Sequence, residues 1–523
     1  MAFNRRTLIK QVSAFSLTSA LASTALISGC QKPSNSRQIL VGINGRARML
    51  DPRKATDALS SRINRLLYRQ LIDFDSRFQP IPDLAEWQQL SAKHYRFSLI
   101  DESFFPDGEQ LNAEDVAATY RSVLDKGLGS AHRGSLKHIR AIEVINDKQL
   151  DFYLSHEDAL FVGRLVIGIL PAKMIAQNHQ FQALPIGSGA CEFIAMSEQK
   201  LQLKRRSDGV ELAFIPVKDA TVRVLKLKKG ELDIIQNDLS PELVQYAAKQ
   251  PQLQVDYHYG TGFGYIGFNF EDPLLSQLAL RQAIAHGIDR QAVIDAVFSG
   301  RARLAGGLLV PKHWCGVEDM PQYDYNPSLA RQLIKQVIEQ IKKRSEIRPE
   351  LAGLIKKSQS GQEVIELSYK TSNDPTRIRL ATIYQSQLKP LGIHLKIQSY
   401  DWGTFYNDIK QGRFQLYSLA WVGVKSPDIF QYVFASNAIP PQGANRGRYR
   451  DQLADDLIAQ ASQTEDLAEQ AKLYKRLQKR LQATLAAMPL WYEDQYAVSR
   501  NNISGYQLYA DGRLDGLLRV QKN

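Results

Sequence analysis

Two kinds of hydrophobic spacing alternate along this chain, and their alternation restricts its fold more than any other feature. Tyr95-Arg96-Phe97-Ser98-Leu99 places apolar residues at every second position, as in a half-buried strand. Shortly afterwards, Val116, Tyr120, Val123 and Leu124 recur at helical spacing. Further strands are expected at residues 39–43, 201–203, 212–215, 365–369 and 393–397. The pattern predicts the α/β fold class.

Local signals mark where individual elements begin and end. Phe105-Pro106-Asp107-Gly108 contains the residues of a tight turn. Asn112 follows, and its side chain suits the N-cap of the helix that carries Val116. Near the end of the chain, four leucines at i,i+4 spacing predict an amphipathic helix with one buried face: Leu473, Leu477, Leu481 and Leu485. The polar stretch 342–362 is expected to be a surface insertion or linker.

The first thirty residues are typical of a secretory signal. Arg5, Arg6 and Lys10 precede an apolar run over 12–27 that its many Ser and Thr residues make too short and too polar to span a membrane. Ile27-Ser28-Gly29-Cys30 resembles the lipobox of bacterial lipoproteins, in which the cysteine is acylated and becomes the first mature residue. The arginine pair resembles a twin-arginine signal, and an ordinary basic signal is the alternative. We expect an exported protein, periplasmic or at the cell surface, that is held on the membrane by lipid at Cys30.

Composition fits a globular body behind that anchor. Of 523 residues, 44% are hydrophobic and 23% charged, which allows an ample core and two or three domains. After Cys30, no apolar run approaches the length of a membrane span. The formal net charge of +12 favours an anionic ligand or surface, although charge spread over a large surface needs no specific partner.

Cysteine and histidine give little further direction. Beyond Cys30, only Cys191 and Cys315 remain, and whether they form a disulfide is left open because spacing does not show whether they approach each other. The nine histidines are scattered without the close pairing of a zinc site. We therefore expect no bound metal and no cofactor.

Several local patterns occur in an order that resembles one family, the extracellular solute-binding proteins of family 5, which includes dipeptide, oligopeptide and nickel receptors of ABC importers. The strongest is Phe105–Gly108 followed by Leu111-Asn112-Ala113-Glu114-Asp115-Val116, similar to Phe-x-Asp-Gly-x-x-Leu-Thr-Ala-Glu-Asp-Val. The other matching stretches are Leu50-Asp51-Pro52, 185–193, 229–233, 268–269 with 280–290, 325–327 and 388–393. The resemblance extends over nearly all of the mature chain. Its glycines have structural roles of their own, in turns or in close packing.

The resemblance implies a two-lobed periplasmic-binding-protein type II-like fold, with an extra subdomain, a hinge and an interlobe cleft. On that basis, residues 1–30 are the signal peptide and 31–36 a tether. The first lobe comprises 37–260 plus 488–523, with the subdomain at about 76–182, and the second lobe comprises 261–487. A monomer is expected to close on a small-molecule or peptide ligand and deliver it to an ABC permease, with no nucleic-acid partner.

The site residues that the resemblance implies centre on the run from Trp421 to Asp428. In peptide-binding members, an Asp three residues after the Trp pairs with the peptide ammonium, but here Val424 stands at that position and Lys425 follows. An ammonium buried without a carboxylate costs several kcal/mol. Lys425, together with Arg46 and Arg48, favours an anionic or N-blocked ligand. The alternative is that Asp428 or Asp57 replaces the missing carboxylate, so that a free peptide binds.

Weaker candidates lie elsewhere. Thr56 and Asp57 follow the Leu-Asp-Pro turn, where family members place loops that line the cleft. The glycine-rich stretch 260–264 lacks the residues of a phosphate loop and is expected to cross between the lobes, with Phe263 and Tyr265 near the cleft mouth. Their aromatic rings suit packing at least as well as ligand contact.

Catalysis and sensing are two other functions to which the sequence offers some resemblance. Ser197-Glu198-Gln199-Lys200 matches the Ser-x-x-Lys of penicillin-recognising enzymes, but no Ser-Asp-Asn element accompanies it and no helix is expected to start at Ser197. We expect no catalytic residue and no enzyme. A solute sensor at the membrane surface, built on the same scaffold, remains the alternative to transport.

Overall fold

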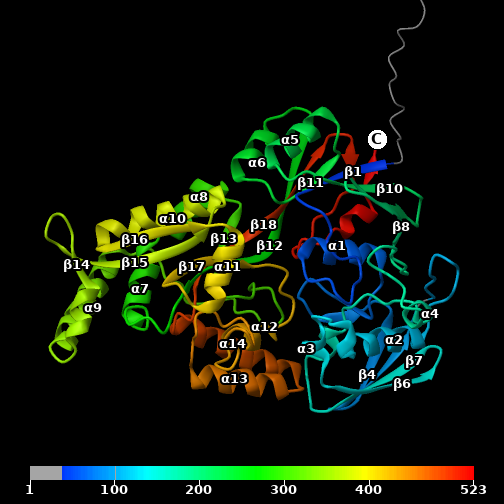
Figure 1. Cartoon of the computed structure of the whole chain (residues 1–523), viewed down its shortest axis with the longest axis horizontal. Coiled ribbons are helices and arrows are strands. Elements are labelled where there is room, and N and C mark those ends of the chain that lie inside the picture. Colours follow the sequence, from blue (N-terminus) through cyan, green and yellow to red (C-terminus); the bar gives the residue numbers. More distant parts are fainter. Residues whose placement is uncertain (1–37, 101) are drawn as a thin grey trace, which may run out of the picture. The chain divides into compact units, whose positions relative to one another are not determined.

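The computed structural model describes residues 38–100 and 102–523 (Figure 1). The predicted signal peptide with Cys30 and the predicted tether lie outside the described residues. Within the described part, no helix combines the length and the apolar character needed to cross a bilayer.

Strands account for one large sheet and three small ones. Those of the large sheet are β1 (Gln38–Ile43), β8 (Cys191–Met196), β9 (Leu201–Arg205), β10 (Glu211–Pro216), β11 (Ile234–Gln236), β12 (Leu253–Phe268), β13 (Ala302–Leu304), β14 (Ile355–Lys357), β15 (Glu363–Ser372), β16 (Ile393–Tyr400), β17 (Leu416–Trp421) and β18 (Met488–Arg500). Those of the small sheets are β2 (Ile72–Phe74) with β3 (Pro80–Pro82), β4 (Ala85–Ser91), β5 (His94–Leu99), β6 (Ile139–Asn146) and β7 (Gln149–Leu154), and β19 (Ile503–Ser504) with β20 (Gln521–Lys522).

Helices connect and cover these strands. The α-helices are α1 (Ala58–Leu67), α2 (Ala113–Leu124), α3 (Arg133–Leu136), α4 (Ala172–Ala176), α5 (Ala220–Lys229), α6 (Pro241–Ala248), α7 (Leu278–Gly287), α8 (Arg290–Phe298), α9 (Pro327–Ser345), α10 (Pro375–Leu388), α11 (Trp402–Gln411), α12 (Ile429–Phe434), α13 (Gln452–Gln463) and α14 (Leu467–Ala483). Short 3-10 helices lie at η1 (Lys126–Leu128), η2 (Val162–Arg164), η3 (Pro349–Leu354), η4 (Lys389–Leu391) and η5 (Asp515–Leu518).

The large sheet is mixed and continuous, in the order β14-β15-β17-β12-β18-β11-β1-β10-β9-β8, with β13 on β18 and β16 on β15. Parallel pairs occur at both ends, between β1 and β10 and between β15 and β16. The long antiparallel pair β12–β18 joins the two ends, and its register shifts between His258 and Gly262. Figure 1 shows this pair running from the region of α5 and α6 toward β17. This mixed sheet with its covering helices is the predicted α/β, two-lobed architecture.

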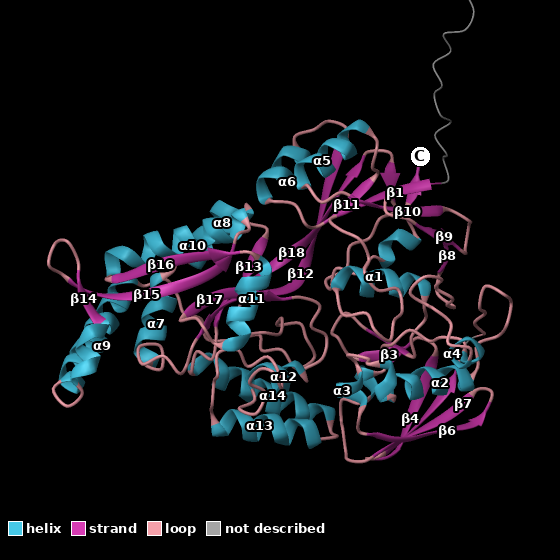
Figure 2. Ribbon diagram, viewed as in Figure 1, coloured by secondary structure: helices cyan, strands magenta, loops and turns pink. Residues whose placement is uncertain are grey.

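The four-stranded sheet β4-β5-β7-β6 forms a separate layer with its own hydrophobic core. Phe97 of β5, Phe152 of β7 and Tyr120 of α2 are fully buried there, and Figure 2 shows α2 lying over these strands. This core draws its buried residues from positions 71–169. The bounds expected for the subdomain and the lobes stay predictions, because a shared core does not locate a domain boundary.

The local predictions are confirmed at several elements. The expected strands coincide with β1, β5, β9, β10, β15 and β16. Asn112 caps α2 in a capping box: its side chain accepts from the backbone of Asp115, whose own carboxylate accepts from Asn112 N. Gly187 and Gly189 pack so closely on α1 that an added Cβ would lie 2.3 Å from backbone atoms of Leu67.

Two observations refine the sequence analysis. The stretch 342–362 is not a plain linker, because it contains the end of α9, the η3 turn and the edge strand β14. Cys191 and Cys315 are both buried and both free, so they form no disulfide with each other.

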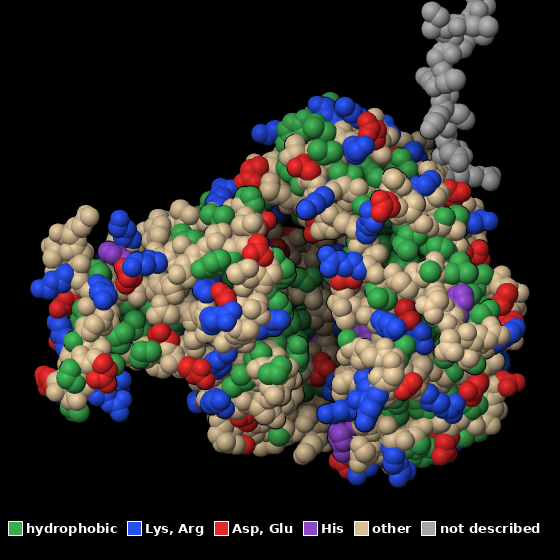
Figure 3. Space-filling view, viewed as in Figure 1, with side chains coloured by type: hydrophobic (Ala, Val, Ile, Leu, Met, Phe, Trp, Pro, Cys, Tyr) green, Lys and Arg blue, Asp and Glu red, His purple; other side chains and the backbone are tan. Residues whose placement is uncertain are grey.

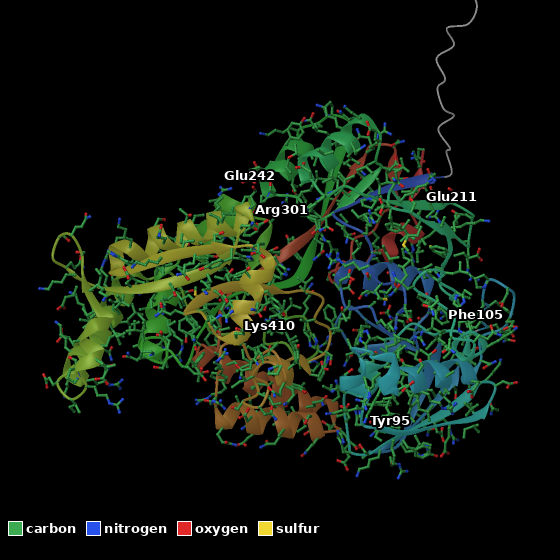
Figure 4. The ribbon with its side chains drawn as sticks, viewed as in Figure 1. Tyr95, Phe105, Glu211, Glu242, Arg301 and Lys410 are labelled. Carbon is green, nitrogen blue, oxygen red and sulfur yellow. The ribbon has the colours of Figure 1, made fainter. Side chains whose placement is uncertain are left out.

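Contacts also join elements that are far apart in the sequence. Glu242 of α6 forms an ion pair with Arg379 of α10. Arg301 stacks on the ring of Tyr257 in β12, 4.0 Å from its centroid. Figure 4 places Glu242 and Arg301 near each other beside the β12–β18 pair.

Three of the four leucines predicted for one helix face lie in α14, whereas Leu485 follows the end of this helix and packs in another core. The leucines of α14 allow a matched test of this packing. Leu477 is fully buried in a core that also contains Leu473 and Leu481, whereas Leu467 at the start of the same helix is 48% exposed. We expect Leu477→Ala to lower the free energy of unfolding by ~2–5 kcal/mol, because it removes buried methyl groups and leaves a cavity. Leu467→Ala, the same substitution on the same helix, should change it by no more than ~0.5 kcal/mol. Denaturant unfolding of both variants measures the difference, and equal losses would contradict the assignment of this face to the core.

Candidate functional site

One cavity, here called the main cavity, has a volume of about 610 Å³, and its walls come from segments that are distant in the sequence. One wall comprises residues 52–74, including α1, with parts of 132–136 and 163–168 and the pair Asp511 and Arg513. The opposite wall is the loop that follows β17, residues 421–429. Figure 3 shows a recessed groove on the visible face, between the region of α11–α14 and the region of α1–α3.

The position of β17 explains how the loop reaches the cavity. Trp421 is the last residue of this strand and pairs with Phe263 of β12, so the loop starts from the centre of the large sheet. Gly423 has a φ of 72°, in the left-handed region that favours glycine, and the chain turns there. Trp421, Val424, Lys425 and Asp428 all line the cavity, and Thr56 lines it from the opposite wall. The structure therefore brings together five of the predicted ligand-binding residues.

Lys425 does not point into the cavity as an uncompensated charge. Its Nζ lies 2.8 Å from Oδ2 of Asp511, whose side chain is only 4% exposed. Arg513 contacts the other oxygen of that carboxylate at 3.2 Å. Burial acts to raise the pKa of Asp511, but the Lys425 and Arg513 charges outweigh it and hold that pKa below its usual range. Both oxygens of this carboxylate are therefore occupied by cations of the protein.

Asp428 forms the second ion pair between the walls. Its Oδ2 accepts from Nη1 of Arg164 at 2.6 Å. Arg164 also donates Nε to Asp158 at 2.7 Å, so one guanidinium serves two carboxylates. Asp428 stands at the N-cap of α12, but its side chain caps no helix N–H. Among residues 38–100 and 102–523 its Oδ1 has no hydrogen-bond partner, and the side chain is 35% exposed.

The carboxylate of Asp158, the second partner of Arg164, is buried and also contacts His138. His138 Nε2 lies 3.0 Å from Asp158 Oδ2. Burial acts to raise the pKa of Asp158, but His138 and Arg164 outweigh it and hold that pKa below its usual range. Asp158 is therefore ionised at neutral pH and takes up part of the charge of Arg164, leaving Asp428 only partly compensated.

A third group of charges surrounds Arg65, which is a residue of α1. Arg65 contacts Asp73 at 3.0 Å and Asp515 at 2.8 Å. Arg513 reaches the same Asp73 at 2.9 Å. Cations and carboxylates alternate here, so these residues compensate one another and make this part of the wall rigid rather than strongly charged.

Arg62 differs from the other cations of the cavity. It lines the cavity from α1. In the described chain, no carboxylate lies within ion-pair distance of its guanidinium, and its side chain forms no hydrogen bond. The cavity thus presents one partly compensated carboxylate, Asp428, and one cation without a carboxylate, Arg62. Such a surface suits a solute that carries both kinds of charge.

The remaining predicted ligand-binding residues lie outside this cavity. Asp57 is the N-cap of α1, where its Oδ1 accepts from Ser60 N at 2.9 Å. Phe263 and Tyr265 are buried in the core behind Trp421, with their rings stacked at 5.8 Å. In the structure, the side chain of Asp57 thus stabilises a helix, and the two aromatic side chains pack in the hydrophobic core.

Sequence reasoning missed five charged residues that line the cavity: Arg62, Arg65, Arg164, Asp511 and Arg513. No local pattern distinguishes them from other surface charges. They meet because α1, η2 and the segment before η5 converge only in the folded chain.

The described residues contain no group of three or more His, Cys, Asp or Glu side chains that could hold a metal ion. Ser197 and Lys200 lie in the tight turn between β8 and β9, where Ser197 N donates to Lys200 O at 2.8 Å. Their spacing therefore reflects a hairpin turn.

Comparison with known proteins identifies relatives along most of the chain. Residues 79–440 match the family of bacterial extracellular solute-binding proteins, family 5. The "Probable di/tripeptide-binding protein 5" of Pseudomonas aeruginosa is 28% identical over 497 residues, covering 86% of this chain and 89% of that protein. The "Dipeptide-binding protein" of Escherichia coli is 24% identical over 480 residues, covering 84% and 86%.

Solved structures share the fold. The ABC transporter substrate-binding protein CtaP of Listeria monocytogenes superposes with a TM-score of 0.80 at 20% identity, covering 93% of this chain and 99% of that chain. NikZ of Campylobacter jejuni, in complex with Ni(L-His), superposes with a TM-score of 0.77 at 21% identity, covering 93% and 100%. The family match over most of the chain, together with this fold, shows that the protein belongs to the bacterial extracellular solute-binding proteins of family 5.

Proposed function

We propose that this chain is the substrate-binding lipoprotein of an ABC importer. It captures a short peptide or peptide-like solute in the main cavity and delivers it to the permease. It acts outside the cytoplasm as a monomer, held on the membrane by lipid on Cys30. The known relatives named above, two of them peptide-binding by name, support this proposal.

One observation carries the proposal: the main cavity lies between two walls that ion pairs connect. Lys425–Asp511 and Asp428–Arg164 each join the loop after β17 to the opposite wall. A solute that contacts both walls favours the arrangement in which they are close, which is how a binding protein signals that it is loaded. The volume of about 610 Å³ is in the range of sites for small organic molecules.

The charges of the cavity favour a solute with a free ammonium group. Asp428 has an oxygen without a partner in the described chain, and it shares Arg164 with Asp158. Lys425 would repel an ammonium less than its place beside Val424 in the sequence indicates, because Asp511 compensates the charge of Lys425 at 2.8 Å. Asp428 thus supplies the carboxylate that Val424 lacks. An anionic or N-blocked solute is the competing ligand class.

Substitution of Asp428 separates the two ligand classes. We expect Asp428→Asn to weaken binding of the free tripeptide Ala-Ala-Ala by about 10–100-fold, the loss of one charge-assisted hydrogen bond of ~1.5–3 kcal/mol. N-acetylated Ala-Ala-Ala should bind weakly to the parent protein, and the substitution should change the affinity for this acetylated peptide little. Titration calorimetry with both peptides measures the ratio of their affinities.

Lys425→Gln serves as the matched control, since it removes a charge from the same loop. It frees Oδ2 of Asp511, so binding of the free tripeptide should be retained or strengthened. If the acetylated peptide binds the parent protein as tightly as the free one, or if Asp428→Asn leaves the ratio unchanged, the ammonium site does not exist.

The lipid anchor is tested independently of the ligand. We expect Cys30→Ser to move the protein from the detergent phase to the aqueous phase in a Triton X-114 partition, because several acyl chains hold a protein far more firmly than any weak surface contact. Cys191→Ser, at a buried free cysteine, should stay in the detergent phase. A Cys30→Ser protein that still partitions with detergent would contradict acylation at this residue.

A further inference from the structure

A second cavity of about 470 Å³ lies beside the main one. Its walls are the end of β1 with residues 44–48, the N-terminal turn of α1, residues 236–238 at the end of β11, Arg223 of α5 and Leu514. Ala58 and Arg62 line both cavities. The second cavity, here called the basic recess, therefore opens beside the main cavity at Arg62.

Four arginines line the basic recess: Arg46, Arg48, Arg62 and Arg223. Arg46 has only a long, exposed contact of 3.5 Å with Glu198, which contributes little. Arg48 and Arg62 have neither an ion pair nor a side-chain hydrogen bond in the described chain. Three guanidinium groups with little or no compensation thus surround one hollow, where they repel one another unless an anion is present.

Arg223 is the buried member of the set, at 1% exposure. Its guanidinium donates to two backbone carbonyls, Val217 O at 2.5 Å and Asp238 O, and its Nε is buried without a partner. Carbonyls fix the orientation of the group but do not neutralise it, so its charge adds to the field in the recess.

The two carboxylates that line the recess offset this charge incompletely. Asp57 is engaged as the N-cap of α1 through Ser60 N. Asp238 is exposed, and among the described residues it forms no ion pair with any arginine of the recess. The N-terminus of α1 lines the same wall and adds the positive end of a ten-residue helix dipole.

We propose that the basic recess binds an anionic group, a carboxylate or phosphate, at the end of a solute whose other end occupies the main cavity. Arg62 lies where the two cavities meet and contacts the anionic group first, with Arg48 and Arg46 around the outer part of the recess. This inference rests on the proposed function, because it extends the solute that the main cavity captures. The solute then carries an ammonium end near Asp428 and an acidic end in the recess.

Two sources of the anion share this chemistry: the acidic end of the solute and a free inorganic anion. The tripeptides Ala-Ala-Ala and Ala-Ala-Glu test the first source, by titration calorimetry at constant ionic strength. Inorganic phosphate alone tests the second, by the shift that it causes in the thermal unfolding midpoint, with chloride as reference. The variants are Arg48→Gln and Arg48→Gln/Arg62→Gln. Arg331→Gln is the matched control, since Arg331 is an exposed arginine on α9 outside both cavities.

We expect the parent protein to bind Ala-Ala-Glu about tenfold more tightly than Ala-Ala-Ala, as one or two added charge-assisted hydrogen bonds provide. Arg48→Gln should reduce this preference, the double variant should abolish it, and Arg331→Gln should retain it. The ratio within each variant is the readout, so a general loss of affinity does not imitate the effect.

The other outcomes are equally informative. A phosphate-dependent shift that the double variant loses, without any preference for Ala-Ala-Glu, would assign the recess to a free anion and overturn the link to the solute. Failure of both tripeptides together with a phosphate shift would contradict the peptide ligand of the proposed function but retain the recess as an anion site. No preference and no shift beyond that of chloride would overturn the recess as a binding site.

Discussion

The antiparallel pairing of β12 with β18 is the constraint on which the rest of the structure depends. These strands, Leu253–Phe268 and Met488–Arg500, pair along most of their length and lie at the centre of the large sheet. On one side they lead to β11 and β1, whose end forms a wall of the basic recess. On the other they lead to β17, whose last residue, Trp421, begins the loop of the main cavity. The backbone hydrogen bonds of one strand pair therefore set how the cavity walls face each other.

Charge compensation then determines what the cavity can accept. Most of the cations in its lining contact a carboxylate, and these pairs neutralise the charges that the sequence shows as a basic excess. Burying a charge without a partner is costly, so the residues that stay uncompensated are informative. Here they are the free oxygen of Asp428 and the guanidinium of Arg62, one of each sign. These two charges of opposite sign favour a dipolar solute over a purely anionic one.

Much of the fold was predictable because its signals are local. The alternation in β5, the capping box at Asn112 and the leucine stripe of α14 each depend on residues within a few positions of one another. The loop from Trp421 to Asp428 was also identified in advance, by resemblance. Lys425 lines the main cavity, but the compensation of its charge was not foreseeable. Its partner, Asp511, lies 86 positions away along the printed sequence, in a segment with no distinguishing pattern.

The sequence by itself determined the fold class, six of the strands, the N-cap at Asn112 and the family resemblance, and it predicted a site around Trp421. Only the tertiary structure decided which charges remain available: it paired Lys425 with Asp511, divided Arg164 between two carboxylates, assigned Asp57 to a helix cap and left Arg62 between two cavities. The physical reason is the range of the interactions. Periodicity and capping act over a few residues, whereas a charge is neutralised by whatever group the fold brings within about 4 Å, however distant it is in sequence.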